Sequence, residues 1–340
     1  VEVARAVAGE SKATYINAVL RSISADLDIY NDLESDANVS DLEKLSVLYS
    51  HPIWIITAYY DQLKDWDAVR DLLRQNNIPV APHIVSWPGK STVSEILETG
   101  GEKLAIGTYS VLSNHLPNEY PAIKDKRAGV QDMGSQLVSE IFFATKNDTA
   151  QKWLDLCAGP GGKAALLHNL LQVEKPNDGF LANEPTQHRA ELVARVVPKN
   201  KIVSFDGRDF ASFNETYDRI LIDAPCTGLG ALRRRPEARW RRSINDLKEL
   251  LPLQRELIDS AYQMLNPGGI IGFVTCSPLL AETKSQVLDA KYRHKDLSIL
   301  DISKYSPSGQ TGVNDDGTMQ LWTHLDGSDS MFMALLQKSA

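Results

Sequence analysis

The sequence predicts an α/β fold, in which a doubly wound, mostly parallel sheet with one antiparallel strand follows a small α/β lobe and a helical segment. Three observations predict it. A glycine-rich turn over residues 157–163 stands between an apolar run, Trp153 to Leu156, and an alanine- and leucine-rich helix start, Ala164 to Leu171. Four later apolar runs each end in a polar turn. Residues 1–60 instead show the apolar periodicity of helices.

The chain divides into three expected parts. Residues 1–62 are expected to be helical, because leucines recur on one helix face at Leu42, Leu45 and Leu48. Residues 63–145 are expected to form the small, RRM-like α/β lobe. Residues 146–340 are expected to form the sheet domain.

Within these parts several elements can be placed. In the small lobe we expect a helix over Trp66 to Gln75, a strand over Pro79 to Val85 and a turn at residues 87–90. A late strand over Met331 to Gln337 is expected to pair antiparallel to the rest of the sheet.

The glycine-rich turn has the form of a ligand cradle. Glycines let the backbone approach a ligand because they carry no Cβ, and the helix that follows offers unpaired N–H groups. The turn lacks the G-x-G-x-x-G of dinucleotide sites, and Ala164 follows Lys163 where a P-loop needs a hydroxyl. An adenosine ligand without phosphates, such as S-adenosyl-L-methionine, therefore suits it; a tight strand-to-helix connection is the alternative. The cradle consists of Cys157, Ala158, Gly159, Pro160, Gly161, Gly162 and Lys163.

Acidic residues follow the next three predicted strands, which lie over residues 179–184, 201–205 and 217–222. The acids are Glu184, Asp206 and Asp223. Ligands of open α/β sheets bind at the carboxyl ends of the strands, where an acid after the second strand commonly binds ribose. We therefore expect Glu184 to bind ribose and Asp206 to accept from the adenine amino group. A helix cap or turn is the alternative for each acid.

The chain has three cysteines, Cys157, Cys226 and Cys276. This small, odd number argues against a disulfide framework and for a reducing compartment, so we expect a cytoplasmic protein. The gaps of 69 and 50 residues hold no Cys-x-x-Cys and no nearby His pair, so we expect no metal. Cys226 ends an Asp-Ala-Pro-Cys turn, and Cys276 follows a fifth strand over Gly269 to Val274. Both suit a reactive thiolate beside the cradle; packing as small buried apolar residues is the alternative.

The net charge of −8 argues at first against a nucleic-acid partner. The acids gather at the chain ends, however, and residues 61–295 hold 30 basic against 29 acidic residues. Arginines interleaved with a tryptophan lie over residues 233–242 and favour RNA contacts; a solvated helix start is the alternative. His188 and Arg189 are expected to be ordinary helix surface. The predicted RNA-binding residues are Arg233, Arg234, Arg235, Arg239, Trp240 and Arg241.

These motifs together resemble one family. The cradle, the turn that ends in Cys226 and the Thr-Cys-Ser turn around Cys276 are similar to those of the Sun (Fmu) family of RNA cytosine carbon-5 methyltransferases. Gln131 to Leu137 resembles that family's helix ahead of the cofactor strand, and residues 234–237 resemble its arginine-proline segment. The resemblance covers roughly residues 125–340 and implies a Rossmann-like, S-adenosylmethionine-dependent methyltransferase sheet.

The resemblance also implies roles for single residues. Cys276 is the nucleophile that adds to carbon 6 of cytosine, and Cys226 is the second cysteine, which assists product release. Lys163 faces the target base, and Asp223 contacts both its amide edge and the cofactor. The implied substrate is small-subunit ribosomal RNA, whose target base must leave its stack. We expect a monomer that binds no membrane, since no apolar run reaches 18 residues.

The start of the chain departs from the family pattern. Residues 16–21 resemble the end of a NusB-like helical domain, of which only the last part is present. The sequence begins with Val1 and not with an initiator methionine, so we expect a fragment or a truncated form.

Two rival functions compete with methyl transfer. An NAD-linked dehydrogenase requires the dinucleotide glycine pattern, which is absent. A non-catalytic RNA-binding or ribosome-assembly factor that keeps the fold has no need of two strand-end thiols.

Overall fold

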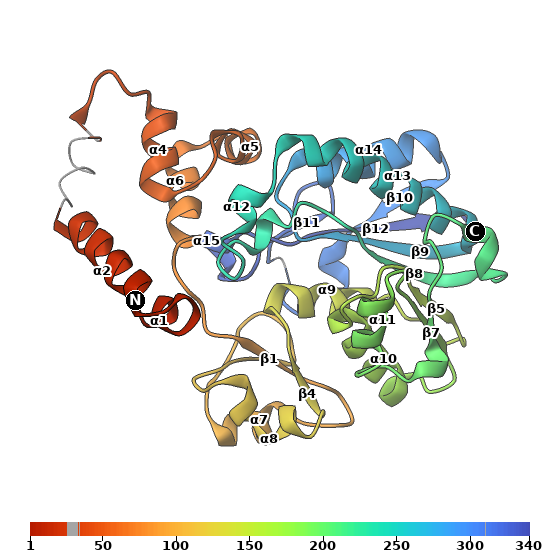
Figure 1. Ribbon diagram of the computed structural model, residues 1–340. Coiled ribbons are helices and arrows are strands. Elements are labelled where there is room, and N and C mark those ends of the chain that lie inside the picture. The colour runs from red at the N-terminus through yellow and green to blue at the C-terminus, as the bar shows by residue number, and fades with distance from the viewer. Residues whose placement is uncertain (26–32, 34, 310) are drawn as a thin grey trace. The chain divides into compact units, whose positions relative to one another are not determined.

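The computed structural model describes residues 1–25, 33, 35–309 and 311–340, which fall into two compact units, residues 1–56 and 57–340. Helices build the first unit (Figure 1): α1 (Glu2–Ala8), α2 (Glu10–Ala25), α4 (Asp41–Tyr49) and the start of α5 (Ile53–Leu63). Helix α4 begins with a capping box. The Ser40 side chain accepts from the Glu43 N–H, and the Glu43 carboxylate bonds back to Ser40.

The second unit begins with a lobe built on a small antiparallel sheet. Its strands, in spatial order, are β2 (Glu102–Lys103), β3 (Ser110–Leu112), β1 (His83–Ser86) and β4 (Ala128–Val130). Its helices are α6 (Trp66–Gln75), at the predicted position, α7 (Val93–Thr99) and α8 (Pro121–Lys124). The strand predicted over residues 79–85 starts four residues late, because Pro79 and Pro82 have no N–H to donate to a ladder.

The larger sheet follows. In spatial order its strands are β10 (Leu297–Leu300), β12 (Phe332–Lys338), β9 (Leu265–Thr275), β8 (Tyr217–Asp223), β5 (Lys152–Asp155), β6 (Gly179–Asn183) and β7 (Ile202–Val203), with β11 (Met319–Gln320) paired to β12. The pairs from β7 to β9 are parallel, and β12 is antiparallel to both of its main neighbours. The predicted sheet with one antiparallel strand is confirmed.

Helices cover both faces of this sheet (Figure 1). The helices of this part are α9 (Met133–Ala144), α10 (Gly162–Glu174), α11 (Gln187–Val193), α12 (Ala238–Arg241), α13 (Leu247–Met264), α14 (Lys284–Arg293) and α15 (Thr323–Asp326). Successive strand residues face opposite cores. Trp153 packs with Phe142 of α9 on one face, and Leu154 packs with Leu257 of α13 on the other. Among the described residues, no helix is both long and apolar enough to cross a membrane.

The strand order reverses at β5. The next strand in sequence, β6, lies on one side of β5, and β8 lies on the other. Loops that leave neighbouring strands in opposite directions open a crevice at the carboxyl edge, where ligands of doubly wound sheets bind. The turn after β5, which contains the cradle, lies at this switch point.

Candidate active site

Backbone hydrogen bonds fix the cradle between the strands on either side of β5. The Leu156 N–H donates to the carbonyl of Leu221 in β8 at 2.8 Å, and the Ala158 N–H donates to the carbonyl of Asn183 at the end of β6 at 2.9 Å. Gly161, with a φ of 113°, is the N-cap of α10 and takes a left-handed conformation that favours glycine. Helix α10 therefore starts at the carboxyl edge of the sheet.

A buried acid shapes the other wall of the cradle. Glu184 is only 3% exposed, and it accepts from the Gly159 N–H at 3.1 Å and from the Thr186 N–H at 2.9 Å. A Cβ on Gly159 would lie 2.1 Å from the Glu184 carboxylate, so this position requires glycine. Arg189 lies 3.4 Å from the same carboxylate and donates to the Gly159 carbonyl. Arg189 is exposed on α11, as predicted, and its side chain also contacts the cradle.

Asp206 lies at the next strand end along this edge. Its carboxylate is about half exposed and pairs with Arg208 at 2.6 Å. The hydrogen bonds from Arg208 lower the pKa of Asp206 to about 2. Strand β7 ends earlier than predicted because Asn183, which sequence reasoning missed, bonds both the N–H and the carbonyl of Phe205. Asn183 also donates to the Leu156 carbonyl at 3.0 Å, so it ties three strand ends together.

The two predicted reactive cysteines meet. Cys226 follows β8 and Cys276 follows β9, and these strands pair in parallel. Their Sγ atoms lie 3.4 Å apart, within hydrogen-bonding distance for sulfur. The Gly230 N–H, further along the first loop, donates to the Cys276 carbonyl at 2.9 Å. Cys157 instead packs against the core on the α13 face.

The two thiols differ in acidity. The hydrogen bond with Cys226 lowers the pKa of Cys276, and the nearby Lys163 ammonium also lowers it, against the opposing effects of burial and of Asp223. The pKa of Cys226 is raised, first by its hydrogen bond to Cys276 and then by burial. Of the two thiols, Cys276 is therefore the one whose surroundings favour the thiolate. The thiolate is the nucleophilic form of cysteine.

An ion pair connects the thiols to the cradle. The Lys163 Nζ, in the first turn of α10, lies 2.8 Å from the Asp223 Oδ2 at the end of β8. Burial alone would lower the pKa of Lys163, but the Asp223 charge raises it above its ordinary value. Below them Asp155, the last residue of β5, is fully buried, and burial together with the Asp223 charge raises its pKa to about 8. The sequence prediction did not include Asp155, although an acid that closes an apolar strand beside a ligand turn is a recognisable signal.

The arginine segment is not one exposed strip. Arg239 is only 4% exposed, and its guanidinium donates to the Asn76 carbonyl at 2.7 Å and to the Asn77 Oδ1 at 2.6 Å. Its prediction as an RNA-binding residue is wrong, because these bonds hold it inside the protein. Arg234 pairs with the buried Asp329, and Arg233 donates to the Gly327 carbonyl at 2.5 Å.

Four of the six predicted RNA-binding side chains are exposed; besides Arg234, which pairs with Asp329, three remain as an outward face. These are Arg235, Trp240 and Arg241, all exposed, with Trp240 62% exposed. Trp240 and Arg241 are consecutive residues of the single-turn helix α12.

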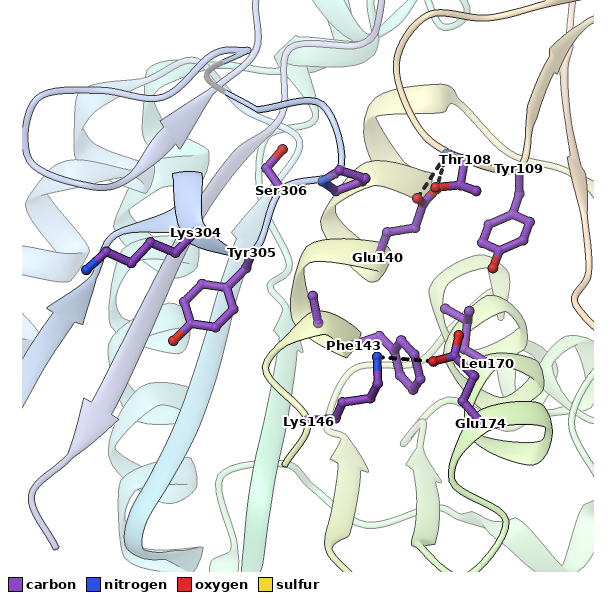
Figure 2. Close-up of a pocket in the computed structure, with 12 residues that line it drawn as sticks. Thr108, Tyr109, Glu140, Phe143, Lys146, Leu170, Glu174, Lys304, Tyr305 and Ser306 are labelled. Carbon is purple, nitrogen blue, oxygen red and sulfur yellow. Dashed lines mark hydrogen bonds and ion pairs between the residues drawn. The ribbon is translucent and has the colours of Figure 1, made fainter. Parts of the chain in front are cut away.

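A separate hollow of about 280 Å³ lies between the small lobe, the ends of α9 and α10, and the segment after β10 (Figure 2). Glu140 accepts from the Thr108 N–H there with both carboxylate oxygens, at 2.9 Å each. Lys146 pairs with Glu174 at 3.1 Å. None of the predicted site residues lines this hollow. Within the described part of the chain, no cluster of three or more His, Cys, Asp or Glu side chains is arranged to hold a metal ion.

Comparison with known proteins decides the family. The family model described as 16S rRNA methyltransferase RsmB/F matches residues 141–337, which is more than half of the chain. The chain belongs to the RsmB/F family. The predicted resemblance and the predicted S-adenosyl-L-methionine cofactor are thereby confirmed, and the chain is an RNA methyltransferase.

Several individual proteins are similar to this chain. The putative methyltransferase Rv1407 of Mycobacterium tuberculosis is 39% identical over 96% of this chain and 73% of its own length. Ribosomal RNA small subunit methyltransferase B of Pectobacterium carotovorum is 33% identical over 65% of this chain and 49% of its own length. The crystal structure of PH0851 superposes with a TM-score of 0.77 at 26% identity, over 89% of this chain and 70% of that one.

Proposed function

We propose that this RsmB/F protein methylates carbon 5 of a cytosine in small-subunit ribosomal RNA, through a covalent bond between Cys276 and carbon 6. The observation that carries the proposal is the pair of unequal thiols, 3.4 Å apart, at the carboxyl edge of the sheet. Carbon 5 of cytosine is a weak nucleophile, and a thiolate that adds to carbon 6 converts the ring into an enamine. A family member that methylated a more nucleophilic atom would have no use for this pair.

The residues around the cradle fit S-adenosyl-L-methionine. Because a Cβ at Gly159 would collide with Glu184, this position of the cradle has to be a glycine, and no side chain fills the cradle there. The residues that would hold the cofactor are those of the cradle, with Glu184 for ribose, Asp206 for adenine and Asp223 beside Lys163. When bound, the cofactor supplies an activated methyl group to carbon 5.

Residues of this site then act in the addition, in holding the base and in the release. The Cys276 sulfur forms a bond to carbon 6 while the electrons of the carbon 5–carbon 6 double bond move toward ring nitrogen 3. Lys163 and Asp223 hold the polar edge of the base, the ammonium as a donor and the carboxylate as an acceptor for the exocyclic amine. After carbon 5 is methylated, solvent water takes its proton, the electrons of that C–H bond re-form the double bond between carbons 5 and 6, and the bond from Cys276 to carbon 6 breaks. Cys226, whose sulfur lies 3.4 Å from that of Cys276, donates its proton to the departing sulfur and regains one from solvent.

A direct assay tests this function. Purified protein is incubated with methyl-labelled S-adenosyl-L-methionine and unmodified small-subunit ribosomal RNA, and the digested nucleosides are identified by mass spectrometry. The expected product is 5-methylcytidine, and bisulfite sequencing then gives its position. A methyl group on any other atom would refute the carbon-5 proposal. Cofactor binding without transfer would favour the non-catalytic RNA-binding or assembly alternative.

The adenine site is tested at Asp206. Asp206→Ala is expected to weaken S-adenosyl-L-methionine binding by about 1 kcal/mol, less than the roughly 1.5–3 kcal/mol of a hydrogen bond to a charged group, because Asp206 is half exposed and shared with Arg208. Isothermal titration calorimetry measures the change. Asp301→Ala, at an acid with a similar local turn far along the chain, serves as the control. Unchanged affinity in Asp206→Ala would mean that the adenine lies elsewhere.

The outward arginine face is tested by its salt dependence. Replacing Arg235 and Arg241 with alanine should weaken RNA binding and lower the slope of log affinity against log salt by about 0.7 per lost phosphate contact. The matched control replaces Lys152 and Lys199, which are exposed at the opposite, amino edge of the sheet, and should leave the slope unchanged. Equal slopes for the two double variants would make the face a solvated surface only.

A further inference from the structure

Glu282 is fully buried at the end of the short 3₁₀ turn Leu280–Glu282, in the loop that follows β9. Both oxygens of its carboxylate accept hydrogen bonds. Oε1 accepts from the Thr227 N–H at 2.8 Å and from the Gln254 amide at 3.2 Å. Oε2 accepts from the hydroxyls of Thr227 at 2.5 Å and Ser277 at 2.6 Å.

The two hydroxyl partners adjoin the two thiols. Thr227 directly follows Cys226, and Ser277 directly follows Cys276. The two hydroxyl oxygens lie 3.4 Å apart, the same separation as the two sulfurs. One carboxylate therefore spans the two loops at the residues adjoining the thiols.

Other bonds fix these loops to the scaffold one at a time. Gln254 of α13 donates to the Pro225 carbonyl at 2.8 Å, in the first loop. Gln62 of α5 donates to the Pro278 carbonyl at 2.9 Å, in the second. Each of these bonds reaches one loop. The Gly230 N–H joins the two loops through the Cys276 carbonyl, and the Glu282 carboxylate joins them through the residues that follow the thiols.

We propose that Glu282 is the positioning residue of the thiol pair, whose carboxylate sets the separation and mutual orientation of Cys226 and Cys276. The inference rests on the proposed function only for the roles that it gives to the two thiols. The charge of Glu282 also affects the acidity of Cys226. The pKa of Cys226 is raised mainly by its hydrogen bond to Cys276 and by burial, and the Glu282 charge raises it further. The Glu282 charge therefore opposes ionisation of Cys226.

The test measures thiol geometry apart from methyl transfer. Diamide oxidises neighbouring thiols to a disulfide, and the rate of the Cys226–Cys276 disulfide, followed by peptide mass spectrometry, reports how the two sulfurs face each other. Glu282→Ala should slow this reaction about tenfold and slow single-turnover methyl transfer about 100-fold, as small misplacements of reacting groups do. Affinity for S-adenosyl-L-methionine should stay the same, because the cradle is untouched.

Glu282→Gln should restore most of the disulfide rate. Its amide oxygen still accepts from the Thr227 N–H and from Gln254, while its NH₂ donates to the two hydroxyls. Removing the charge should shift the pH profile of the disulfide rate to lower pH, since the Cys226 thiol then ionises more readily. A residue that only supports the fold would leave this profile in place.

Glu140→Ala is the matched control, because Glu140 is also buried and accepts backbone N–H groups, but lies at the separate hollow. In this variant, diamide should oxidise Cys226 and Cys276 at the parental rate. If Glu282→Ala does not fold, Thr227→Val removes one of the four bonds and should give an intermediate rate. A parental disulfide rate in a folded Glu282→Ala or Thr227→Val would overturn the inference. If Glu282→Ala forms the disulfide slowly but the parental enzyme makes no 5-methylcytidine, the proposed function is rejected and the positioning role stands.

Discussion

Cys276→Ser is expected to abolish methyl transfer, with a loss of about 10⁴-fold or more, as when a covalent nucleophile is removed. A serine hydroxyl without an adjacent base is a far weaker nucleophile than a thiolate, and the effects that lower the pKa of Cys276 do not make a hydroxyl ionise near neutral pH. Single-turnover transfer of labelled methyl groups to ribosomal RNA measures the loss. Affinity for S-adenosyl-L-methionine, measured by calorimetry, should stay the same.

The binding measurement is the internal control for this variant. Cys276 lies at the end of β9, whereas the cradle follows β5, two strands away, so the substitution should leave the cofactor site intact. Full activity in Cys276→Ser would reject the covalent mechanism. Loss of both cofactor binding and transfer would show only that the variant is misfolded.

Cys226→Ser is expected to trap the enzyme on its RNA. Cys276 can still attack and the base can still be methylated, but the thiol that protonates the departing sulfur is gone. The covalent complex should therefore accumulate, and turnover should fall by about 100-fold or more, from the lower end of the range for loss of a general acid upward. Denaturing electrophoresis shows the complex as a shifted band that requires both RNA and cofactor.

Reactions without RNA or without cofactor are the controls for this band. Accumulation of the complex in Cys276→Ser, with Cys226→Ser merely inactive, would reverse the two roles. Full methyl-transfer activity in both variants would mean that the two cysteines are only packing residues. The double variant should form no complex, because no thiol remains to attack carbon 6.

Much of the catalytic edge was predictable from short-range patterns. Buried parallel strands appear as apolar runs, and the polar residue that ends each run marks the carboxyl edge. Cys226 and Cys276 are 50 residues apart in the chain, yet both were placed at strand ends. Two adjacent parallel strands necessarily bring such residues to one edge, and the 3.4 Å separation of the sulfurs agrees with that expectation.

The arginine segment shows where such patterns fail. Arginine at the start of a helix suggests exposure, but the burial of Arg239 depends on Asn76 and Asn77, which come from the small lobe more than 160 residues earlier. The contacts of Arg189 and Glu282 were not predicted, for the same reason. An arginine or a glutamate looks like surface in a linear pattern until its partners from other loops are known.

The sequence by itself determined the order and type of the main elements, the cradle and the strand-end thiols, because each depends on residues close together in the chain. Only the tertiary structure decided which thiol is the more acidic, which arginines face outward and which buried carboxylates join the loops. Acidity and burial arise from charges and hydrogen bonds between distant segments, and these exist only once β8 and β9 lie side by side and the small lobe packs against the segment after Cys226.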